Sequence, residues 1–214
     1  ITRERSTNVG PITQQDLSDA FFKAAGIRPN DETAIMLQRL PSLGRISADS
    51  PDRQFLDGFI LDGLRAESII ELSKSWTQEI MQKDWKNPLT QIGLSILAEY
   101  IKNDIKKIDT FLYLARKVSS EKNKVLASDI VSALCMLQEN RIDFKDIVID
   151  GGEFLYLSFE NKEVDKLRIS NSIINKLDLT NAKLSMNVNI EKCYISTIYG
   201  ISSRKSIPEQ FHDC

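Results

Sequence analysis

The sequence predicts an α+β protein in which an N-terminal winged-helix and helical region precedes a C-terminal β-solenoid. Apolar residues recur at every fifth position between 144 and 184, a spacing that fits neither the helical period of about 3.6 nor the strand period of about 2. The preceding residues instead place apolar side chains at helical spacing between cap residues. We therefore expect a winged-helix-like domain at 1–75, a helical segment at 76–140, a β-helix at 141–201, and a truncated tail or the start of a further repeat at 202–214.

The N-terminal part first predicts two short helices. Thr13 followed by Asp16 suits a helix N-cap, and Gly26 suits the end of that helix. A second helix is expected to start after Asn30 or Asp31. The apolar side chains expected to face inward from these helices are Leu17, Ala20, Phe21, Ala24, Ile35, Leu37 and Leu40.

A hairpin and a longer helix are expected to follow. Pro41 should end the second helix, because proline cannot continue one. The segments 43–46 and 53–56 favour two strands, joined by the polar loop 47–52. Asp57 then suits the N-cap of a longer helix. Two helices, a hairpin and a closing helix are the outline of a winged-helix domain.

Further helices are expected up to residue 140, and Asp129 is expected to cap the last of them. Trp76 and Trp85 flank a loop, where packing at a helix junction is the plain interpretation and an interface anchor is the alternative. The last helix is expected to lie against the first coil of the solenoid and to cover its open end. The apolar residues at helical spacing are Ile92, Leu97, Ile101, Ile105, Ile108, Leu112 and Ala115.

The five-residue period predicts which side chains point into the solenoid. The series is Phe144, Ile149, Phe154, Phe159, Val164, Ile169, Ile174, Leu179 and Leu184. A companion series two residues earlier is Ile142, Ile147, Gly152, Leu157, Lys162, Leu167, Ser172, Leu177 and Ala182. The register slips by one residue and resumes at Ile190 and Ile195. Lys162 on an inward position indicates a bulge or corner from which its stem reaches solvent, and Gly151-Gly152 indicates a tight opening turn.

The repeat also resembles a known family. The segments 177–181 (LDLTN) and 182–186 (AKLSM) are similar to the pentapeptide-repeat unit, which runs roughly A-[DN]-L-x-x. That resemblance implies a right-handed, four-sided β-helix with four pentapeptides in each coil, and hence about three coils here. Bulky Leu and Ile replace the Ala that the family usually places inward. Such an architecture implies a scaffold and a binding surface, and it implies no reaction.

A second resemblance lies in the N-terminal part. The segments 37–46 (LQRLPSLGRI), 52–57 (DRQFLD) and 64–66 (LRA) are similar to the winged helix that follows the ATPase core in bacterial NACHT-type proteins, which are signal-transduction ATPases with numerous domains. In that family the ATPase is a nucleotide-controlled switch, and a C-terminal repeat array senses a ligand. The resemblance implies ATP or ADP with Mg²⁺ in the parent protein and none in this fragment, since the chain contains no phosphate-binding loop.

Composition sets further bounds. The net charge is −2 over 214 residues and is evenly divided along the chain, which argues against a nucleic-acid-binding field and against an acidic DNA mimic. No apolar run approaches the roughly 18–20 residues that span a bilayer. Cys135, Cys193 and Cys214 are far apart and odd in number, so they predict neither a metal site nor a disulfide framework and favour a reducing, cytoplasmic setting. Cys135 is expected to be a buried small apolar residue.

No catalytic, cofactor-binding or metal-ligating residues can be named. A hydrolase triad needs a His, and the only one, His212, lies in the predicted tail. Arg53 and Asp57 could form a salt bridge across the base of the hairpin, of little value if exposed. The chain has no initiating Met, and we expect a fragment of a larger protein that lacks its N-terminal ATPase domain.

The favoured function is that of a non-catalytic regulatory and ligand-sensing fragment of a NACHT-like signalling ATPase, with a role in bacterial defence. A protein partner or sensed ligand would bind the β-helix. A stand-alone adaptor built on the pentapeptide repeat is the alternative. A DNA-binding or DNA-mimicking protein is the third hypothesis, although the helix expected at 57–73 offers one Arg against four acidic residues.

Overall fold

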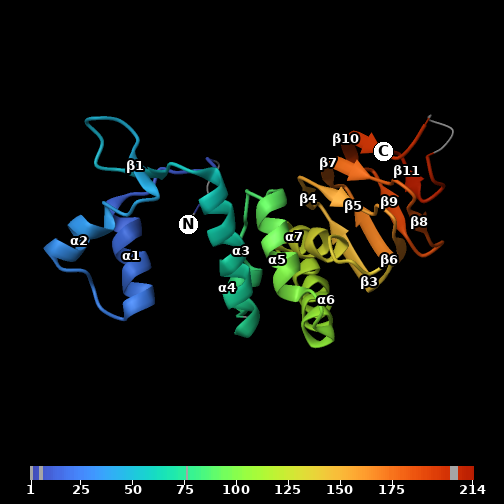
Figure 1. Ribbon diagram of the computed structural model, residues 1–214, viewed down its shortest axis with the longest axis horizontal. Helices are drawn as coiled ribbons and strands as arrows, with labels where there is room; N and C mark the ends of the chain where they lie inside the picture. The colour runs from blue at the N-terminus through green and yellow to red at the C-terminus, as the bar shows by residue number, and fades with distance from the viewer. Residues whose placement is uncertain (1, 5–6, 76, 203–206) are drawn as a thin grey trace.

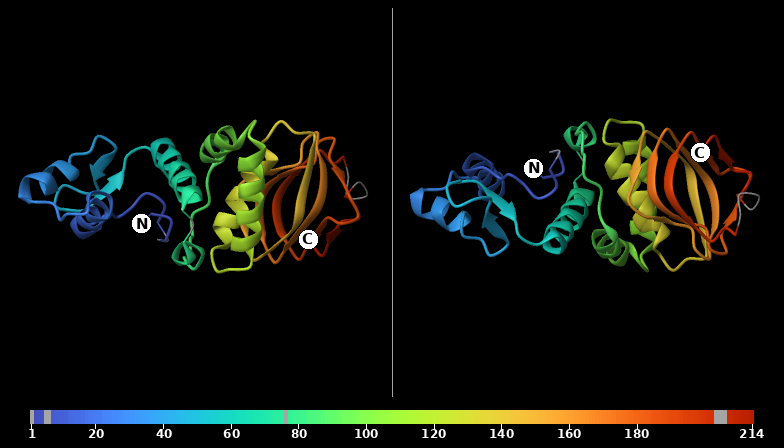
Figure 2. Two further views of the ribbon diagram at one scale, coloured as in Figure 1. Left: turned by 90° about the horizontal axis from the view of Figure 1, so that it is seen from below. Right: turned by 90° about the horizontal axis from the view of Figure 1, so that it is seen from above.

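The computed structural model describes residues 2–4, 7–75, 77–202 and 207–214. Residues 2–4 lie near the middle of an elongated molecule, and the chain then forms a lobe at one end before it crosses to the other end (Figure 1). An N-terminal lobe lies at one end, a layer of helices lies in the middle, and a parallel β-solenoid lies at the far end (Figure 2). The α+β class and the C-terminal solenoid are therefore as predicted.

The N-terminal lobe contains two helices and a hairpin. Its helices are α1 (Gln14–Ala25) and α2 (Asp31–Leu37), and its strands are β1 (Leu43–Arg45) and β2 (Arg53–Phe55). The strands pair antiparallel around the polar loop, as expected. Ile12 adds an antiparallel bridge to the outer edge of β2.

The caps of the lobe follow the sequence. Thr13 and Asp16 form a capping box at the start of α1, and Gly26 ends that helix in the left-handed conformation, with φ 75°. Asn30 caps α2 by accepting a hydrogen bond of 2.9 Å from the backbone N–H of Thr33. The second helix ends at Leu37, earlier than the Pro41 boundary that was predicted.

The apolar face predicted for this lobe is not buried. No residue of α1 or α2 is buried, and Ile35 and Leu40 are 51% and 43% exposed. The reason is the position of α3 (Gly58–Lys74), which begins at the predicted cap Asp57. This helix packs mainly against the helices that follow it, so it does not close over the first two. The elements of a winged helix are present, whereas a closed winged-helix core is not formed by the described residues.

The middle layer joins the lobe to the solenoid. After α3 come α4 (Gln78–Met81), α5 (Gln91–Ile101), α6 (Ile105–Ser119) and α7 (Lys124–Cys135). Helix α3 packs on α5, and both α5 and α6 pack on α7. Helix α7 and its neighbour α6 then cover the first coil of the solenoid (Figure 1), as predicted.

The start of α7 corrects one prediction. Asp129 was expected to cap this helix, but the cap is Asn123, whose side chain accepts from the N–H of Leu126 at 3.2 Å. Asp129 lies in the middle of the helix and is 2% exposed. Its carboxylate has partners from other segments, Arg3 and the N–H of Leu89, so burial of a charge in mid-helix is compensated there.

The solenoid consists of parallel strands that pair with strands one coil away. Offsets between paired residues are 22 at Asp143↔Asp165, 20 at Ile149↔Ile169 and 21 at Ile169↔Ile190, so the chain makes about three turns. The solenoid strands form two parallel sheets. In one, β6 pairs with β3 on one side and with β8 and β9 on the other; in the second, β7 pairs with β10 on one side and with β4 and β5 on the other. The strands are β3 (Arg141–Asp150), β4 (Glu153–Phe154), β5 (Leu157–Ser158), β6 (Glu163–Ser170), β7 (Ile173–Asp178), β8 (Lys183–Leu184), β9 (Asn189–Glu191), β10 (Tyr194–Tyr199) and β11 (Phe211–His212).

The predicted inward series fills the solenoid. From Phe144 to Ile174 each member is at most 1% exposed, and Leu179 is 5% exposed. The slip of one residue is also confirmed, because Ile169 pairs with Ile190 and Ile174 pairs with Ile195. The solenoid core is continuous with that of the middle helices.

The corners of the coils use left-handed backbone. Asn161, Asn171 and Asn181 all have positive φ, which asparagine tolerates better than most residues. The amide of Asn181 donates to that of Asn161 at 3.0 Å, which links one corner to the next. Gly151-Gly152 forms a corner as well, between β3 and β4, but the solenoid already begins ten residues earlier at Arg141.

Lys162 is also at a corner, but its side chain does not reach solvent. The residue is 9% exposed, and its ammonium donates to the carbonyls of Leu137 at 2.5 Å and Glu139 at 3.1 Å. These carbonyls follow the C-terminal end of α7, where a cation is favourable. The inward lysine therefore fastens the solenoid to its capping helix.

The last described residues continue the solenoid. In β11, Phe211 pairs in parallel register with Ile190, and His212 pairs with Glu191. The 207–214 segment thus adds a strand to the edge of the sheet.

Candidate functional site

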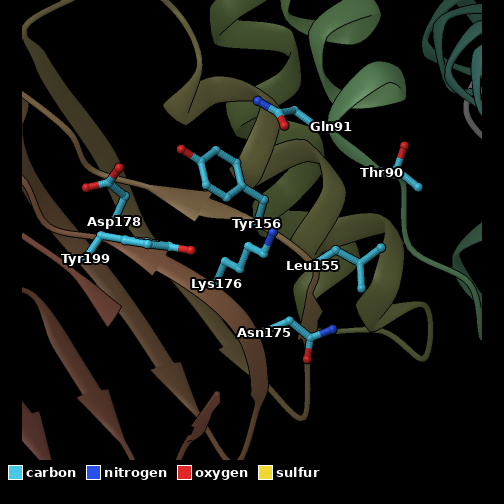
Figure 3. A pocket seen from close by; sticks show the side chains of 8 residues that line it. All are labelled: Thr90, Gln91, Leu155, Tyr156, Asn175, Lys176, Asp178 and Tyr199. Carbon is cyan, nitrogen blue, oxygen red and sulfur yellow. The ribbon is translucent and has the colours of Figure 1, made fainter. Parts of the chain in front are cut away.

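The strongest candidate site is a groove of about 500 Å³ between the start of α5 and the outer surface of the solenoid (Figure 3). We call it the α5–solenoid groove. Four segments of the chain contribute to it: the start of α5, the corner between β4 and β5, and the neighbouring strands β7 and β10. Its lining residues are Thr90, Gln91, Leu155, Tyr156, Asn175, Lys176, Asp178 and Tyr199.

The repeat positions the solenoid side of the groove. Ile174 and Leu177 belong to the two inward series and are buried, whereas Asn175, Lys176 and Asp178 of the same strand are not buried and face the outer surface. Register places Tyr199 of β10 directly beside Asp178. In Figure 3 these side chains and Tyr156 surround one hollow.

The groove offers hydrogen-bonding groups that other parts of the described chain do not use. The side chains of Tyr156, Asn175, Lys176 and Tyr199 make no hydrogen bond within the described residues. Asp178 is partly engaged, because its carboxylate accepts from the N–H of Thr180 at 2.9 Å. One ammonium, one carboxylate, an amide and two phenols can recognise a polar segment, and tyrosines are common at protein interfaces.

The helix side of the groove is fixed by Asp62 of α3. Its carboxylate accepts from Thr90 Oγ1 at 2.6 Å, from the Thr90 N–H at 3.0 Å and from the Gly93 N–H at 2.5 Å. Asp62 is 1% exposed and satisfies the donors at the start of α5. A ligand in the groove would therefore contact Thr90, which is hydrogen-bonded to Asp62 of α3.

A second cavity of about 450 Å³ separates the N-terminal lobe from α3 and α4. We call it the lobe cleft. Leu17, Leu43 and Phe55 line it from the lobe, and Leu61 and Leu64 line it from α3. It is the apolar counterpart of the groove, and it exists because α3 does not close over the lobe.

A buried charge cluster lies beside the lobe cleft. Arg3 forms an ion pair with Asp129 of α7, and its guanidinium lies 3.9 Å from the centre of the Trp85 ring. Arg65 of α3 donates to the side chain of Asn8 at 2.6 Å, and burial together with the nearby Arg3 lowers the pKa of Arg65 to about 10. Burial raises the pKa of Asp129, and the Arg3 cation opposes that effect. The cluster ties residues 2–4 to α3 and α7.

The structure tests the predictions made for Trp85 and for the Arg53–Asp57 pair. Trp85 is 7% exposed and packs at a helix junction, while Trp76 lies outside the described residues. The predicted Arg53–Asp57 salt bridge is wrong. Arg53 donates to the backbone of Gln38 and Pro51, and Asp57 caps α3. Hydrogen bonds to backbone carbonyls of the lobe therefore satisfy the buried guanidinium of Arg53.

Two of the three cysteines are buried. Cys135 is 1% exposed, and burial raises the pKa of its thiol well above the usual range, as expected of a small buried residue. Cys193 and Cys214, which are distant in sequence, lie in adjacent coils. Within 2–4, 7–75, 77–202 and 207–214, no three His, Cys, Asp or Glu side chains are placed to hold a metal ion.

Sequence reasoning named no site residue, so the groove was missed. Its solenoid residues fall at outward positions that the period does predict, but nothing in the sequence brings Thr90 and Gln91 beside them. Comparisons with protein families, curated proteins and solved structures give no match for the chain. In the described part of the chain, each helix is too short or too polar to cross a lipid bilayer.

Proposed function

We propose that this chain is a non-catalytic regulatory and partner-sensing region of a NACHT-type signalling ATPase, in a reducing, cytoplasmic setting. Bacterial defence is the role that the resemblance implies. ATP or ADP and Mg²⁺ would bind in a domain outside this chain. The main observation behind the proposal is the exposed apolar surface of the N-terminal lobe, which the missing ATPase domain would cover.

Exposed apolar side chains gather in the lobe and at the start of α3. Among the residues that the structure describes, half of the exposed large apolar ones fall between 22 and 64. Large exposed apolar areas are uncommon on soluble proteins and commonly mark protein interfaces, so this concentration of apolar side chains supports a covering partner. The residues are Phe22, Ile27, Ile35, Met36, Leu40, Ile46, Leu56, Phe59, Ile60 and Leu64.

We also propose the finer architecture that the resemblances imply. A right-handed, four-sided pentapeptide-repeat helix is supported by coil offsets of 20–22 residues and by the burial of every fifth side chain. A winged helix is supported by the order of its two helices, hairpin and closing helix. In the parent protein, the lobe would complete that domain by closing the lobe cleft.

The proposed mechanism is a population shift. A protein partner in the α5–solenoid groove would contact Thr90, which is bonded to Asp62 of α3. Helix α3 carries Phe59 and Leu64 of the apolar surface toward the ATPase. A partner that binds one arrangement of α3 better than the other would favour that arrangement.

The test uses the complete natural protein that contains this chain. We expect it to retain ADP and to form larger assemblies with ATP and partner. The variant Phe59→Asp should release ADP faster and assemble without partner, because a charge enters the surface that holds the closed state. Tyr113→Asp, a comparably exposed aromatic residue on α6, is the matched control and should behave as wild type. A complete protein that binds no nucleotide would overturn the proposal.

The α5–solenoid groove also favours a second candidate, the stand-alone adaptor. In that case a partner would bind the groove with no nucleotide involved. The double variant Tyr156→Ala and Lys176→Ala should then abolish partner binding whether or not nucleotide is present. Retained affinity for duplex DNA at physiological salt would instead favour the DNA-related hypothesis.

A further inference from the structure

Two cysteines occupy the same repeat position in successive coils. Cys193 and Cys214 are 21 residues apart, which equals the offset that pairs Ile190 with Phe211 three residues earlier. The preceding coils place Gly152 and Ser172 in the corresponding position, since Ile169 pairs with Ile190. We call this stack the Ser/Cys column.

Hydrogen bonds confirm that the members of the column are equivalent. Ser172 Oγ accepts from the N–H of Gly152 one coil earlier at 2.9 Å, and Cys214 Sγ accepts from the N–H of Cys193 at 3.5 Å. Each side chain also donates to the carbonyl two residues before it. Those distances are 2.7 Å for Ser172, 3.3 Å for Cys193 and 3.3 Å for Cys214.

The stacking brings the two thiols within reach of a bond. Neighbouring strands lie about 4.8 Å apart, and disulfide-bonded cysteines have Cα atoms about 4.4–6.8 Å apart. The Cys214 sulfur already touches the backbone of Cys193, so side-chain rotation with a small local shift is sufficient. We infer that Cys193 and Cys214 form a reversible redox site that closes as an intramolecular disulfide when the protein meets a low-molecular-weight disulfide oxidant.

The two thiols have different roles in this reaction. Cys214 is exposed, whereas Cys193 is 4% exposed. Burial, and then the neighbouring Cys214 thiol, raises the pKa of Cys193 to about 11. Because thiolates are the attacking species, Cys214 is the first nucleophile and Cys193 the resolving one.

The reaction balances with the oxidant as the only added reagent. The Cys214 thiolate attacks one sulfur of the oxidant RSSR, forms a mixed disulfide and releases RS⁻. Cys193 then loses its proton to solvent and attacks the Cys214 sulfur, which releases the second RS⁻. Both leaving groups take up protons as RSH. The two protein thiols are oxidised by two electrons, and the oxidant is reduced to two thiols.

Closure would fasten the open end of the solenoid. The α7 end of the solenoid is covered, whereas β10 pairs with β7 alone and β11 pairs with β9 alone among the described strands. A bond between Cys193 and Cys214 would hold β11 to the preceding coil through a loop of about 20 residues. This site does not depend on the nucleotide-linked function proposed above.

The test is oxidation of the folded chain with oxidised glutathione, followed by alkylation and mass spectrometry. We expect a mass lower by two hydrogen atoms, a cross-link between the peptides containing Cys193 and Cys214, and reversal by reduced glutathione. The unfolding temperature should rise by roughly 5 °C. Cys135 should stay reduced until the chain is unfolded.

Matched variants separate closure from simple modification. Cys193→Ser should trap one glutathione on Cys214, and serine fits there because Ser172 fills the equivalent position. Cys135→Ser should still form the bond, and circular dichroism would establish that each variant is folded. A wild-type chain that accumulates the Cys214 mixed disulfide as stably as Cys193→Ser, or that forms only disulfide-linked dimers, would overturn the inference.

Discussion

The N-terminal lobe and the solenoid differ in how they bury apolar side chains. In the lobe, helices α1 and α2 contain no buried residue. In the solenoid, Phe144, Phe154 and Phe159 are at most 1% exposed. Each coil covers the next, so repetition gives the solenoid a core of its own. The lobe has too few elements to cover its apolar faces, so its fold should depend on contact with another domain or protein.

Truncating one phenylalanine in the solenoid and one at the exposed start of α3, beside the lobe, tests this difference in burial. Phe154→Ala should lower the free energy of unfolding by about 3–5 kcal/mol, because it leaves a cavity in a packed core. Phe59→Ala, at 68% exposure, should change it by less than about 0.5 kcal/mol. Chemical denaturation followed by circular dichroism measures both. Equal losses would mean that the lobe surface is already covered within the chain.

The buried charge cluster tests whether the middle helices belong with the solenoid. Asp129→Ala leaves Arg3 buried without its anion and should cost about 3 kcal/mol. Asp129→Asn is the control that keeps the shape and the acceptor for the Leu89 N–H, and it should cost less. Hydrogen exchange should show α7 and the first coil weakened together. A loss confined to residues 2–4 would place the cluster outside the solenoid's cooperative unit.

The attachment of the solenoid to its capping helix depends on Lys162. Lys162→Met keeps the length of the side chain but removes the hydrogen bonds to Leu137 and Glu139, and it should cost about 1–2 kcal/mol. Lys166→Met, at a lysine of β6, is the matched control. Its ammonium pairs with Asp143 with both side chains well exposed, so the cost should be near zero. Thermal unfolding of the two variants side by side would show whether the inward lysine is distinctive.

The two regions were also unequally predictable. The period of five identified the inward residues of the solenoid and the slip before Ile190, because each coil repeats the same local arrangement. The caps Thr13, Asn30 and Asp57 were predictable for a similar reason, since their partners lie two or three residues away.

What the sequence could not supply were contacts between distant segments. Aspartate is a residue type that commonly caps helices, and only the fold brings Arg3 and Leu89 to the Asp129 carboxylate. A lysine at an inward repeat position suggests a side chain that reaches solvent at a corner. Only the position of α7 brings the carbonyl of Leu137 within hydrogen-bonding distance of the Lys162 ammonium. The groove likewise needs α5 beside β7. Cys193 and Cys214 are the exception, since a coil of 21 residues would have aligned them.

Two glutamates of the solenoid, one half-buried and one exposed, should have small and opposite effects on stability. Burial raises the pKa of Glu153 above 4.5, with a further contribution from Asp129. The pKa of Glu163 is lowered by its hydrogen bond with the exposed ammonium of Lys183, 2.9 Å away. Their contributions to stability should therefore change with pH in opposite directions.

A raised folded pKa means that the native state binds the Glu153 proton more tightly than the unfolded chain does. Its stabilisation is complete below pH 4.5 and is lost as the pH rises through the folded pKa. Glu153→Gln should thus be more stable than wild type at pH 7 and lose that advantage at pH 4. Glu163→Gln should be less stable at pH 7 and match wild type only below the lowered pKa. Unfolding midpoints of both variants and the wild type, measured between pH 4 and pH 7, test these opposite pH dependences. Parallel pH profiles would show that Glu153 is as well solvated as Glu163.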